Sequence, residues 1–288
     1  MQNLDLQSLE IFRHVAVEGS VTKAAAKLNR VQSNISTRIK QLEERINKDL
    51  FIRKNRKLTL TPEGQILLTY AERLLQLSLE ATEALNEWKP SGVLKIGAME
   101  STAAARLPEI LSLYNQLYPE VKVELKTDTA GGLITRLTNF DIDVAFIAEP
   151  VVFENISTQP VFEEKLVLVV PQSFPPLMNV DEISGKTVIA FEQGCAYRRY
   201  LEEWMLECGI VPGGFIAISS YLAILANVSA GTGFAIVPQS VLDTVNTKGT
   251  FQIYPLPGKY SKIKTLLTSR VDYRSVKLDT LSELLPLP

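Results

Sequence analysis

The sequence is poor in the side chains on which much enzyme chemistry depends. Its 288 residues include one histidine, His14, and two cysteines, Cys195 and Cys208. These residues can build neither a disulfide framework nor a set of zinc-ligand spacings. Because the single histidine lies in the first predicted helix, no Ser-His-Asp or Cys-His arrangement can form in the rest of the chain. A Gly-x-Ser-x-Gly elbow and a Gly-rich phosphate loop are also missing. We therefore expect neither an enzyme nor a bound metal or cofactor.

Long hydrophobic runs are missing too. A membrane span needs about 18 consecutive apolar residues, and the first residues, MQNLDLQSLEIF, lack the basic start and apolar run of a signal peptide. The low cysteine content suits a reducing compartment. We therefore expect a cytoplasmic protein with no membrane partner, and its length suggests two or three domains.

Charge is unevenly distributed, although the net charge is only −2. Residues 1–60 hold 12 Lys and Arg against 6 Asp and Glu, whereas the other 228 residues hold 18 against 26. A basic start on an acidic remainder indicates that a contact with nucleic acid would be confined to the first 60 residues.

This basic segment has the pattern of three short helices. Apolar residues from Leu6 recur at helical spacing until Gly19, and Ser20 is a suitable N-cap for a second helix over residues 21–28. The run Ala24-Ala25-Ala26 permits the close helix packing that a helix-turn-helix requires.

The third helix is expected to differ sharply between its two faces. Ile35, Ile39, Leu42 and Ile46 form one apolar stripe. The opposite face carries short hydrogen-bonding groups suited to reading base edges in a DNA major groove, with basic side chains that can reach phosphates. The expected DNA-contacting residues of this helix are Gln32, Ser33, Ser36, Thr37, Arg38 and Lys40. Taken alone, the pattern also fits a small helical domain with an ordinary polar surface.

The next segment, LFIRKNRKLTL, favours the DNA-binding interpretation. Apolar residues flank a basic turn, as in a two-stranded ribbon whose tip grips phosphate or enters the minor groove. The expected backbone-contacting residues are Arg30, in the turn before the third helix, and Arg53, Lys54, Arg56 and Lys57 in the ribbon. Residues 1–60 are thus predicted to form a winged helix-turn-helix DNA-binding domain.

The stretch SLEIFRHVAVEGSVTKAAAKLNRVQSNISTRIKQLEERINKDLFIRKNRKLTLTPEG resembles the DNA-binding domain of LysR-type transcriptional regulators. It shares the early Phe, Gly-Ser at the second helix, paired alanines, Gln-x-x-x-Ser, Ile-x-x-Leu-Glu, and Leu-Phe before an Arg-rich turn ending in Leu-Thr-x-x-Gly. It departs from the family at Val31, where a capping Ser is frequent, and at Ser33-Asn34, where Pro-Ala is common. These departures leave the DNA sequence open, since readout depends on these side chains.

A long linker helix is predicted from Pro62, capped by Thr61, to about Trp88. The spacing of its apolar residues is that of a coiled-coil seam, which is formed by Leu67, Tyr70, Leu74, Leu77, Ala81, Ala84 and Trp88. One alternative is a single long helix lying on a neighbouring domain. The family resemblance implies instead that residues 61–90 pair two copies of the chain, which suits two heads reading separate half-sites.

From residue 93 onwards strands and helices alternate, which predicts an α/β fold with parallel sheets. The expected strands cover residues 93–99, 121–127, 142–149, 166–171, 187–191, 215–219 and 233–238, and the expected helices cover 106–119, 131–140, 196–207, 221–231 and 275–285. The resemblance implies a two-lobe, periplasmic-binding-protein-like (type 2) effector domain over residues 91–288. Lobe I would take about 93–160 and 265–288, and lobe II about 161–264.

Ligands of open α/β sheets bind beyond the carboxyl ends of the strands, near helix N-termini. The residues expected there, some supported by the resemblance, are Ser101, Thr102, Ala148, Glu149, Gln193, Cys195, Tyr197, Arg198, Ser219 and Ser220. Helix capping alone would explain any one of them. Helix N-termini favour an organic anion as the effector, whereas Glu100 and Glu149 oppose that preference.

Cys195 allows a redox interpretation. It lies at a predicted helix N-terminus near Arg198 and Arg199, an environment that lowers the pKa of a thiol, and some regulators of the resembled family sense peroxide with a cysteine pair. Cys208, however, is expected near the other end of the same helix, too far away for a disulfide unless the helix unfolds. A role in packing or in the pocket wall is the preferred interpretation.

Taken together, these features indicate a sequence-specific transcriptional regulator that binds double-stranded DNA at a dyad promoter site. The resemblance implies a small-molecule effector between the lobes, and dimers that associate further into tetramers. A solute-binding transport protein would share the body, but it would have no use for a basic winged head.

Overall fold

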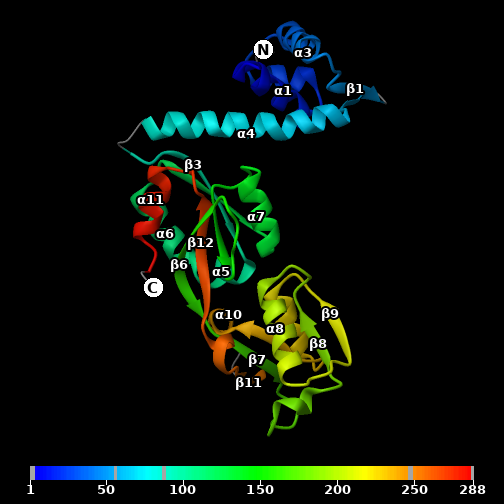
Figure 1. Cartoon of the computed structure of the whole chain (residues 1–288), viewed down its shortest axis with the longest axis vertical. Helices are drawn as coiled ribbons and strands as arrows, with labels where there is room; N and C mark the ends of the chain where they lie inside the picture. The colour runs from blue at the N-terminus through cyan, green and yellow to red at the C-terminus, as the bar shows by residue number, and fades with distance from the viewer. Residues whose placement is uncertain (1–3, 55–56, 86–88, 246–248, 287–288) are drawn as a thin grey trace. The chain divides into compact units, whose positions relative to one another are not determined.

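The computed structural model describes residues 4–54, 57–85, 89–245 and 249–286. The chain divides into two compact units, Met1–Glu87 and Trp88–Pro288. The first carries the basic head and the long helix, and the second is the α/β body (Figure 1).

The first unit combines short helices, a ribbon and one long helix. Its elements are α1 (Leu6–Glu18), α2 (Val21–Lys27), α3 (Gln32–Ile46), β1 (Phe51–Lys54), β2 (Lys57–Leu60) and α4 (Pro62–Leu85). The predicted caps are confirmed: Gly19 ends α1 with a φ of 59°, and the Ser20 hydroxyl accepts a hydrogen bond from Lys23 N at 3.4 Å. Val31 precedes α3 without a side-chain cap, so α3 begins without the usual hydroxyl.

The core of this unit is built on the apolar stripe of α3. Its buried residues include Leu9, Phe12, Val15, Ala24, Ala25, Ile35, Ile39, Leu42 and Leu50. The buried alanines of α2 bring that helix close to its neighbours, as the sequence predicts. The ribbon is joined to the same core, because the rings of Phe12 and Phe51 lie 5.4 Å apart.

The junction between ribbon and α4 is tightly packed. The Thr61 hydroxyl accepts a hydrogen bond from Gly64 N at 2.9 Å and donates one to Asp49 O at 2.8 Å. A Cβ atom on Gly64 would collide with the carbonyl of Leu50, so only glycine fits there. The predicted Thr61 cap is confirmed, and it also ties the start of α4 to the loop before β1.

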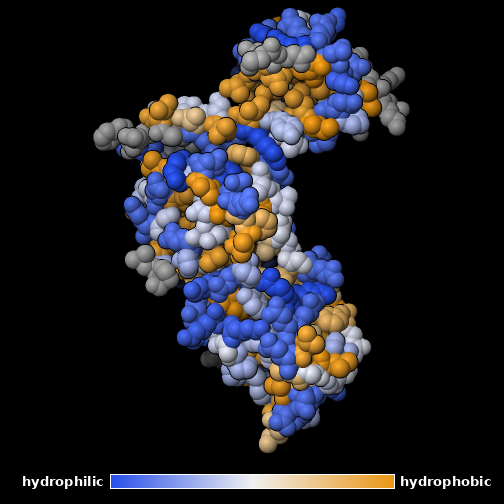
Figure 2. Space-filling view, in the orientation of Figure 1, coloured by the Kyte–Doolittle hydropathy of each residue, from blue (hydrophilic) through white to orange (hydrophobic). Residues whose placement is uncertain are grey.

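The apolar residues of α4 divide between two faces. Leu67, Leu68, Ala71 and Leu75 pack against the core of the head. A second stripe is exposed and consists of Ile66, Tyr70, Leu74, Leu77 and Ala81; Figure 2 shows hydrophobic side chains on the surface along this helix. The predicted seam is therefore wrong at Leu67, which faces the core. The last two residues of the predicted seam cannot be compared in this way, because Trp88 and the side chain of Ala84 lie outside the described residues.

Lobe I of the second unit is a five-stranded sheet with the strand order β4-β3-β5-β12-β6. Its elements are β3 (Gly92–Ala98), α5 (Glu100–Ala105), α6 (Leu107–Leu117), β4 (Val121–Thr127), α7 (Ala130–Thr138), β5 (Val144–Ala148), β6 (Ile156–Glu164), β12 (Ile263–Arg270) and α11 (Val276–Glu283). Helix α7 covers one face of the sheet, and α6 and α11 cover the other (Figure 1).

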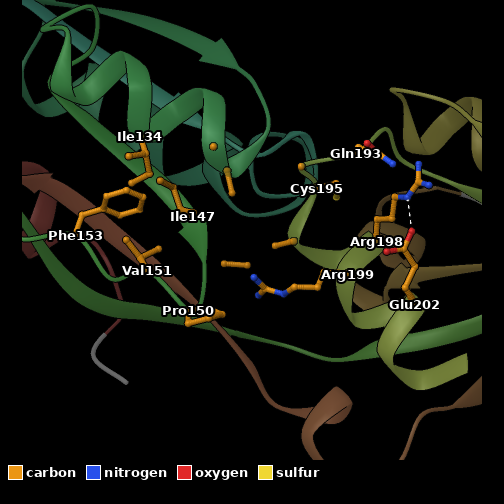
Figure 3. Close-up of a pocket in the computed structure, with 15 residues that line it drawn as sticks. Ile134, Ile147, Pro150, Val151, Phe153, Gln193, Cys195, Arg198, Arg199 and Glu202 are labelled. Carbon is orange, nitrogen blue, oxygen red and sulfur yellow. Dashed lines mark hydrogen bonds and ion pairs between the residues drawn. The ribbon is translucent and has the colours of Figure 1, made fainter. Parts of the chain in front are cut away.

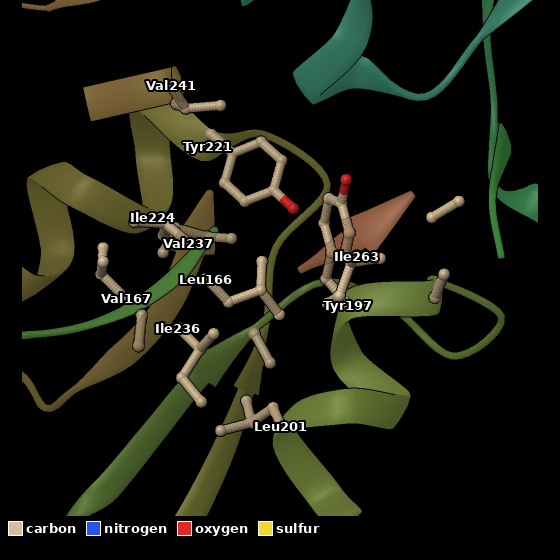
Figure 4. Packing of buried hydrophobic residues seen from close by; sticks show 14 of the residues in the cluster. Leu166, Val167, Tyr197, Leu201, Tyr221, Ile224, Ile236, Val237, Val241 and Ile263 are labelled. Carbon is tan, nitrogen blue, oxygen red and sulfur yellow. The ribbon is translucent and has the colours of Figure 1, made fainter. Parts of the chain in front are cut away.

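Lobe II contains a three-stranded sheet with the order β10-β7-β11 and a parallel pair, β8-β9. Its elements are β7 (Leu166–Pro171), β8 (Thr187–Ala190), α8 (Ala196–Glu207), β9 (Gly214–Ala217), α9 (Tyr221–Ser229), β10 (Ala235–Pro238), α10 (Gln239–Thr244), β11 (Phe251–Pro255) and two 3₁₀ turns, Val180–Ile183 and Gly258–Ser261. Leu166, Ile224 and Ile236 interdigitate in its core (Figure 4).

The expectation of purely parallel sheets is wrong. β3 runs parallel to β4 and β5, but β12 is antiparallel to both β5 and β6, and β7 is antiparallel to β10 and β11. In lobe I the antiparallel pairs come from β12 and its neighbour β6, two strands that the sequence pattern missed. These two antiparallel strands lie side by side. The chain leaves lobe I at the end of β6, at Glu164, and returns to it at the start of β12, at Ile263.

Replacing Thr61 with Val removes both hydrogen bonds of this side chain and keeps its shape. We expect the first unit to lose about 1–2 kcal/mol of folding free energy, measured as faster amide hydrogen exchange in peptides covering residues 50–70 of the full chain. Thr69→Val is the matched control, because it removes only an exposed bond to Gln65 O. Equal exchange in the two variants would contradict the capping role.

Candidate functional sites

The exposed face of α3 is the first candidate site. Gln32, Ser33, Ser36, Thr37 and Lys40 are exposed, and Arg38 is half-buried. The structure thus brings all six predicted residues onto one surface opposite the buried stripe.

The structure adds a residue that the sequence analysis passed over. Thr22, in the first turn of α2, donates a hydrogen bond to Gln32 Oε1 at 3.3 Å. This contact orients the Gln32 side chain at the start of α3, where Val31 supplies no cap. Sequence spacing gave no signal for it, because the two residues belong to different helices.

The predicted basic residues differ in how far the structure describes them. Arg30 is half-buried in the turn before α3, and Lys40 pairs with Glu44 at 3.6 Å. In the ribbon, Arg53 lies opposite Leu58 and Lys54 lies opposite Lys57 in the register of β1 and β2. Three of the predicted basic residues therefore stand in the strands directly next to the turn. Arg56 and the side chains of Arg53, Lys54 and Lys57 lie outside the described residues.

The second candidate site lies between the lobes and consists of two neighbouring cavities. The arginine cavity, of about 480 Å³, has an apolar wall from lobe I (Ile134, Ile147, Val151 and Phe153) and a polar wall from lobe II (Gln193, Arg198, Arg199 and Glu202) (Figure 3). The acidic cavity, of about 320 Å³, is lined by Glu100, Ser101, Asp128 and Thr129 from lobe I and by Phe191, Glu192, Tyr197, Ser219 and Tyr221 from lobe II. Cys195 lines both cavities.

The cations of the arginine cavity already have partners. Arg198 pairs with Glu202 at 2.8 Å and donates a hydrogen bond to Phe191 O at 3.0 Å. Arg199 lies 3.7 Å from Glu203 and donates a hydrogen bond to Glu149 O at 3.4 Å. The second bond crosses from lobe II to lobe I, so this cavity is bounded by an interlobe contact.

In the acidic cavity, Glu100 bridges the lobes. Its Oε1 accepts a hydrogen bond from Tyr221 N, at the start of α9, at 3.4 Å. Burial raises the pKa of this carboxyl, and the Tyr221 N–H only partly opposes that shift. The other oxygen, Oε2, is buried without a hydrogen-bond partner.

A buried carboxylate also joins the lobes at the crossing strands. Glu164, the last residue of β6, accepts hydrogen bonds from Arg106 Nε of lobe I and from Ser240 Oγ of lobe II, both at 2.7 Å. The Glu164 side chain is 3% exposed. The same contact raises the pKa of Arg106, which therefore stays charged.

Seven of the ten predicted effector-binding residues line the two cavities. Ser101, Cys195, Tyr197 and Ser219 line the acidic cavity, and Ala148, Gln193, Cys195 and Arg198 line the arginine cavity.

The other three predicted residues line neither cavity. Thr102 is 1% exposed, and its hydroxyl is enclosed without a hydrogen-bond partner. The Glu149 carboxylate accepts a hydrogen bond from Lys264 N at 3.0 Å, and Ser220 stands at the N-cap of α9 without a side-chain bond. The structure thus does not bring the predicted residue Thr102 into either cavity, because α5 turns its hydroxyl into the interior.

Sequence reasoning missed several cavity residues. Asp128 and Thr129 follow β4, so the rule used for the other strands would have found them. Phe191, Tyr221 and Arg199 carried no separate signal, because aromatic and charged side chains beside a predicted strand or helix are common.

The thiol of Cys195 differs from the expectation of a lowered pKa. Burial raises its pKa, and the neighbouring backbone N–H groups of Arg198 and Tyr197 only partly oppose this. Cys195 and Cys208 lie at the N-cap and C-cap of α8. Within the described part of the chain, no group of His, Cys, Asp and Glu is placed to hold a metal ion, and no helix there has the length and apolar character of a membrane span.

Comparison with known proteins matches both units. The description "Bacterial regulatory helix-turn-helix protein, lysR family" covers residues 6–65, and "LysR substrate binding domain" covers residues 89–286. The chain is 36% identical over 270 residues to the HTH-type transcriptional regulator GltR of Bacillus subtilis (strain 168), covering 93% of this chain and 91% of that protein. It is also 36% identical over 270 residues to the HTH-type transcriptional regulator CzcR of Bacillus anthracis, covering 93% and 92%.

Solved structures share the fold. A full-length OxyR variant from Pseudomonas aeruginosa matches with a TM-score of 0.75 at 20% identity, covering 98% of this chain and 93% of that one. Full-length CbnR in complex with its target DNA matches with a TM-score of 0.70 at 20% identity, covering 98% and 99%.

The positions of the two cysteines predict that peroxide does not link them. The helix between the caps rises roughly 18 Å at 1.5 Å per residue, whereas a disulfide needs Cα atoms within about 7 Å. After mild peroxide treatment, we expect thiol titration of the denatured full chain and mass spectrometry to show no Cys195–Cys208 bridge. A bridge formed at low peroxide, with α8 retained, would contradict this arrangement.

Proposed function

Because the chain belongs to the LysR family of transcriptional regulators, with its DNA-binding and effector-binding domains, we propose that α3 reads the base sequence and that the ribbon holds the phosphate backbone. The observation that supports this most directly is the face of α3. Helix α3 buries Ile35, Ile39 and Leu42 and exposes the row of amides and hydroxyls from Gln32 to Thr37. Such groups donate and accept hydrogen bonds at base edges.

The basic residues act on the phosphates. Arg30 and Arg38 flank the reading face, and Arg53, Lys54, Arg56 and Lys57 belong to the ribbon. Basic side chains that neutralise phosphates contribute affinity for DNA of any base sequence, and this affinity falls as the salt concentration rises. We therefore assign specificity to α3 and general affinity to the ribbon.

The exposed stripe of α4 pairs two copies of the chain. Tyr70, Leu74 and Leu77 are 56%, 40% and 48% exposed, which leaves a continuous apolar surface on a long helix. Burying such a stripe against its own copy removes apolar area from water and follows coiled-coil spacing. A dimer reads two half-sites, in keeping with a dyad promoter site, and further association of dimers through the bodies would give a tetramer.

The effector acts from the interlobe cleft. Both cavities have walls from the two lobes, so a bound small molecule contacts both and favours one lobe arrangement over another. The changed arrangement alters how the bodies associate and thus how the two heads are spaced on DNA.

The division of roles predicts two kinds of DNA-binding defect. Ser33→Ala or Ser36→Ala should weaken binding to the cognate site by about 1–3 kcal/mol for each lost base contact and leave nonspecific binding unchanged. Lys54→Ala should weaken binding to all sequences and reduce the dependence on salt. The cognate site is first selected from fragmented genomic DNA, and affinities for it and for a scrambled duplex are then measured across salt concentrations.

Equal losses on both duplexes from all three variants would contradict this division. Gln41→Ala is the matched control, since Gln41 is an exposed polar residue of α3 beyond the proposed reading residues.

The α4 stripe predicts the oligomeric state. Leu74→Glu should shift the full chain towards monomers in sedimentation velocity, because a charge would be placed inside an apolar interface. Leu79→Glu is the matched control: Leu79 is 57% exposed but lies on the opposite side of the helix. If both variants, or neither, dissociate, the stripe is not the dimer interface.

A further inference from the structure

The acidic cavity has an unusual balance of charge. Its charged lining residues are Glu100, Asp128 and Glu192, and none of its described lining residues is Lys, Arg or His. Asp128 is neutralised by Arg136, whose Nε lies 2.8 Å from Asp128 Oδ2. Glu192 is exposed. Among these three residues, Glu100 is the one with an enclosed carboxylate oxygen and no ion pair to a Lys or Arg in the described part of the chain.

Two of the helix N-termini beside this cavity, those of α9 and α7, are already occupied by the chain's own oxygen atoms. At α9, Tyr221 N donates to Glu100 Oε1. At α7, Gly132 N donates to Thr129 Oγ1 at 3.2 Å, and Asp128 Oδ1 accepts from Thr129 N at 2.8 Å. An incoming anion would meet a carboxylate at both of these positions, so the attraction of the α9 and α7 N-termini for anions is opposed here.

Two polar groups in the lining remain unsatisfied. Glu100 Oε2 is buried without a hydrogen-bond partner, and an ionised carboxylate oxygen can only accept. Tyr197 is 3% exposed, and its hydroxyl meets no hydrogen-bond partner, although Thr265 and Ser101 lie near enough to lower its pKa against the effect of burial. A buried acceptor is best satisfied by a charged donor or a nearby cation.

Aromatic rings complete the wall. The rings of Phe191 and Tyr221 lie 4.6 Å apart at an angle of 51°, and the Tyr221 hydroxyl points towards Tyr197 (Figure 4). The faces of aromatic rings attract cations and recognise organic ammonium groups, and a carboxylate beside such rings supplies the opposite charge.

We propose that the acidic cavity binds a small organic cation bearing an ammonium group, with the Glu100 carboxylate as its counter-ion and Phe191, Tyr197 and Tyr221 as its aromatic wall. This rests on the proposed function, in which the effector lies between the lobes. Because Glu100 also bonds to Tyr221 across the cleft, the ligand acts directly on an interlobe contact.

The test uses the full chain and probes that differ mainly in charge. The cationic probes are organic ammonium ions of increasing size, of which choline is the largest. They are compared with dimethylbutanol, which is the neutral carbon isostere of choline, and with dimethylbutyrate, which is an anion of similar size. Affinities are measured by isothermal titration calorimetry. We expect at least one ammonium ion to bind roughly tenfold or more tightly than the neutral isostere, and the anion to bind most weakly.

Glu100→Gln isolates the charge, because the amide oxygen still accepts from Tyr221 N. This variant should lose the preference for the cation and keep the affinity for dimethylbutanol. Glu154→Gln, at an exposed position outside both cavities, is the matched control and should behave as the unaltered chain.

Three results would overturn the proposal: no ammonium ion in the series binds, the anion binds more tightly than the cations, or Glu100→Gln leaves the preference intact. Selective binding of the cognate DNA site by the same preparation is measured in parallel. If DNA selectivity persists while the cations fail, the ligand class is wrong and the regulator function stands. If DNA selectivity is absent, the proposed function itself fails.

Discussion

The arrangement of the effector-binding unit depends on one buried carboxylate. Glu164 ends the crossing strand β6 and holds Arg106 of lobe I and Ser240 of lobe II with hydrogen bonds of 2.7 Å. A carboxylate at 3% exposure is strongly unfavourable without such partners, so losing either one would leave a poorly compensated buried charge. The interaction therefore favours lobe arrangements that keep both partners in reach. Both cavities have walls from the two lobes, and their shape follows from that arrangement.

The two cavities of the cleft differ in the charge of their lining residues. The arginine cavity places Arg198 and Arg199 opposite an apolar wall, whereas the acidic cavity places Glu100 among aromatic rings. Cys195 lines both, and burial raises the pKa of its thiol, which favours a role as cavity wall over that of a reactive group. The contacts Arg199–Glu149 and Tyr221–Glu100 cross between the lobes beside the cavities. A ligand in either cavity thus competes with or reinforces contacts that hold the lobes together, which is how binding can shift a conformational equilibrium.

The DNA-binding unit depends on a different constraint: α3 must bury one apolar face and expose one polar face. Its apolar stripe fills the core of the head, and this burial fixes the helix so that the polar row faces outward. The ribbon is held to the same core through the rings of Phe12 and Phe51, and Thr61 ties its loop to α4. Helix α3, the ribbon and the start of α4 are therefore joined through one core.

The sequence alone determined the elements whose periodicity is local. Helical and strand spacing, caps such as Ser20 and Thr61, and the basic turn predicted the winged head, most of the strands of the body and the two faces of α3. It missed β6, β11 and β12. Strand β6 has several exposed residues and little apolar pattern, whereas the buried strand β12 contains polar side chains such as Thr265, Thr268 and Arg270 that break an apolar run. Seven of the ten predicted cleft residues line a cavity, because strand ends followed by helix starts are visible in sequence. Only the tertiary structure turned Thr102 inward and set Glu100 against the start of α9, because these depend on which segments, distant in the chain, the crossing strands bring face to face.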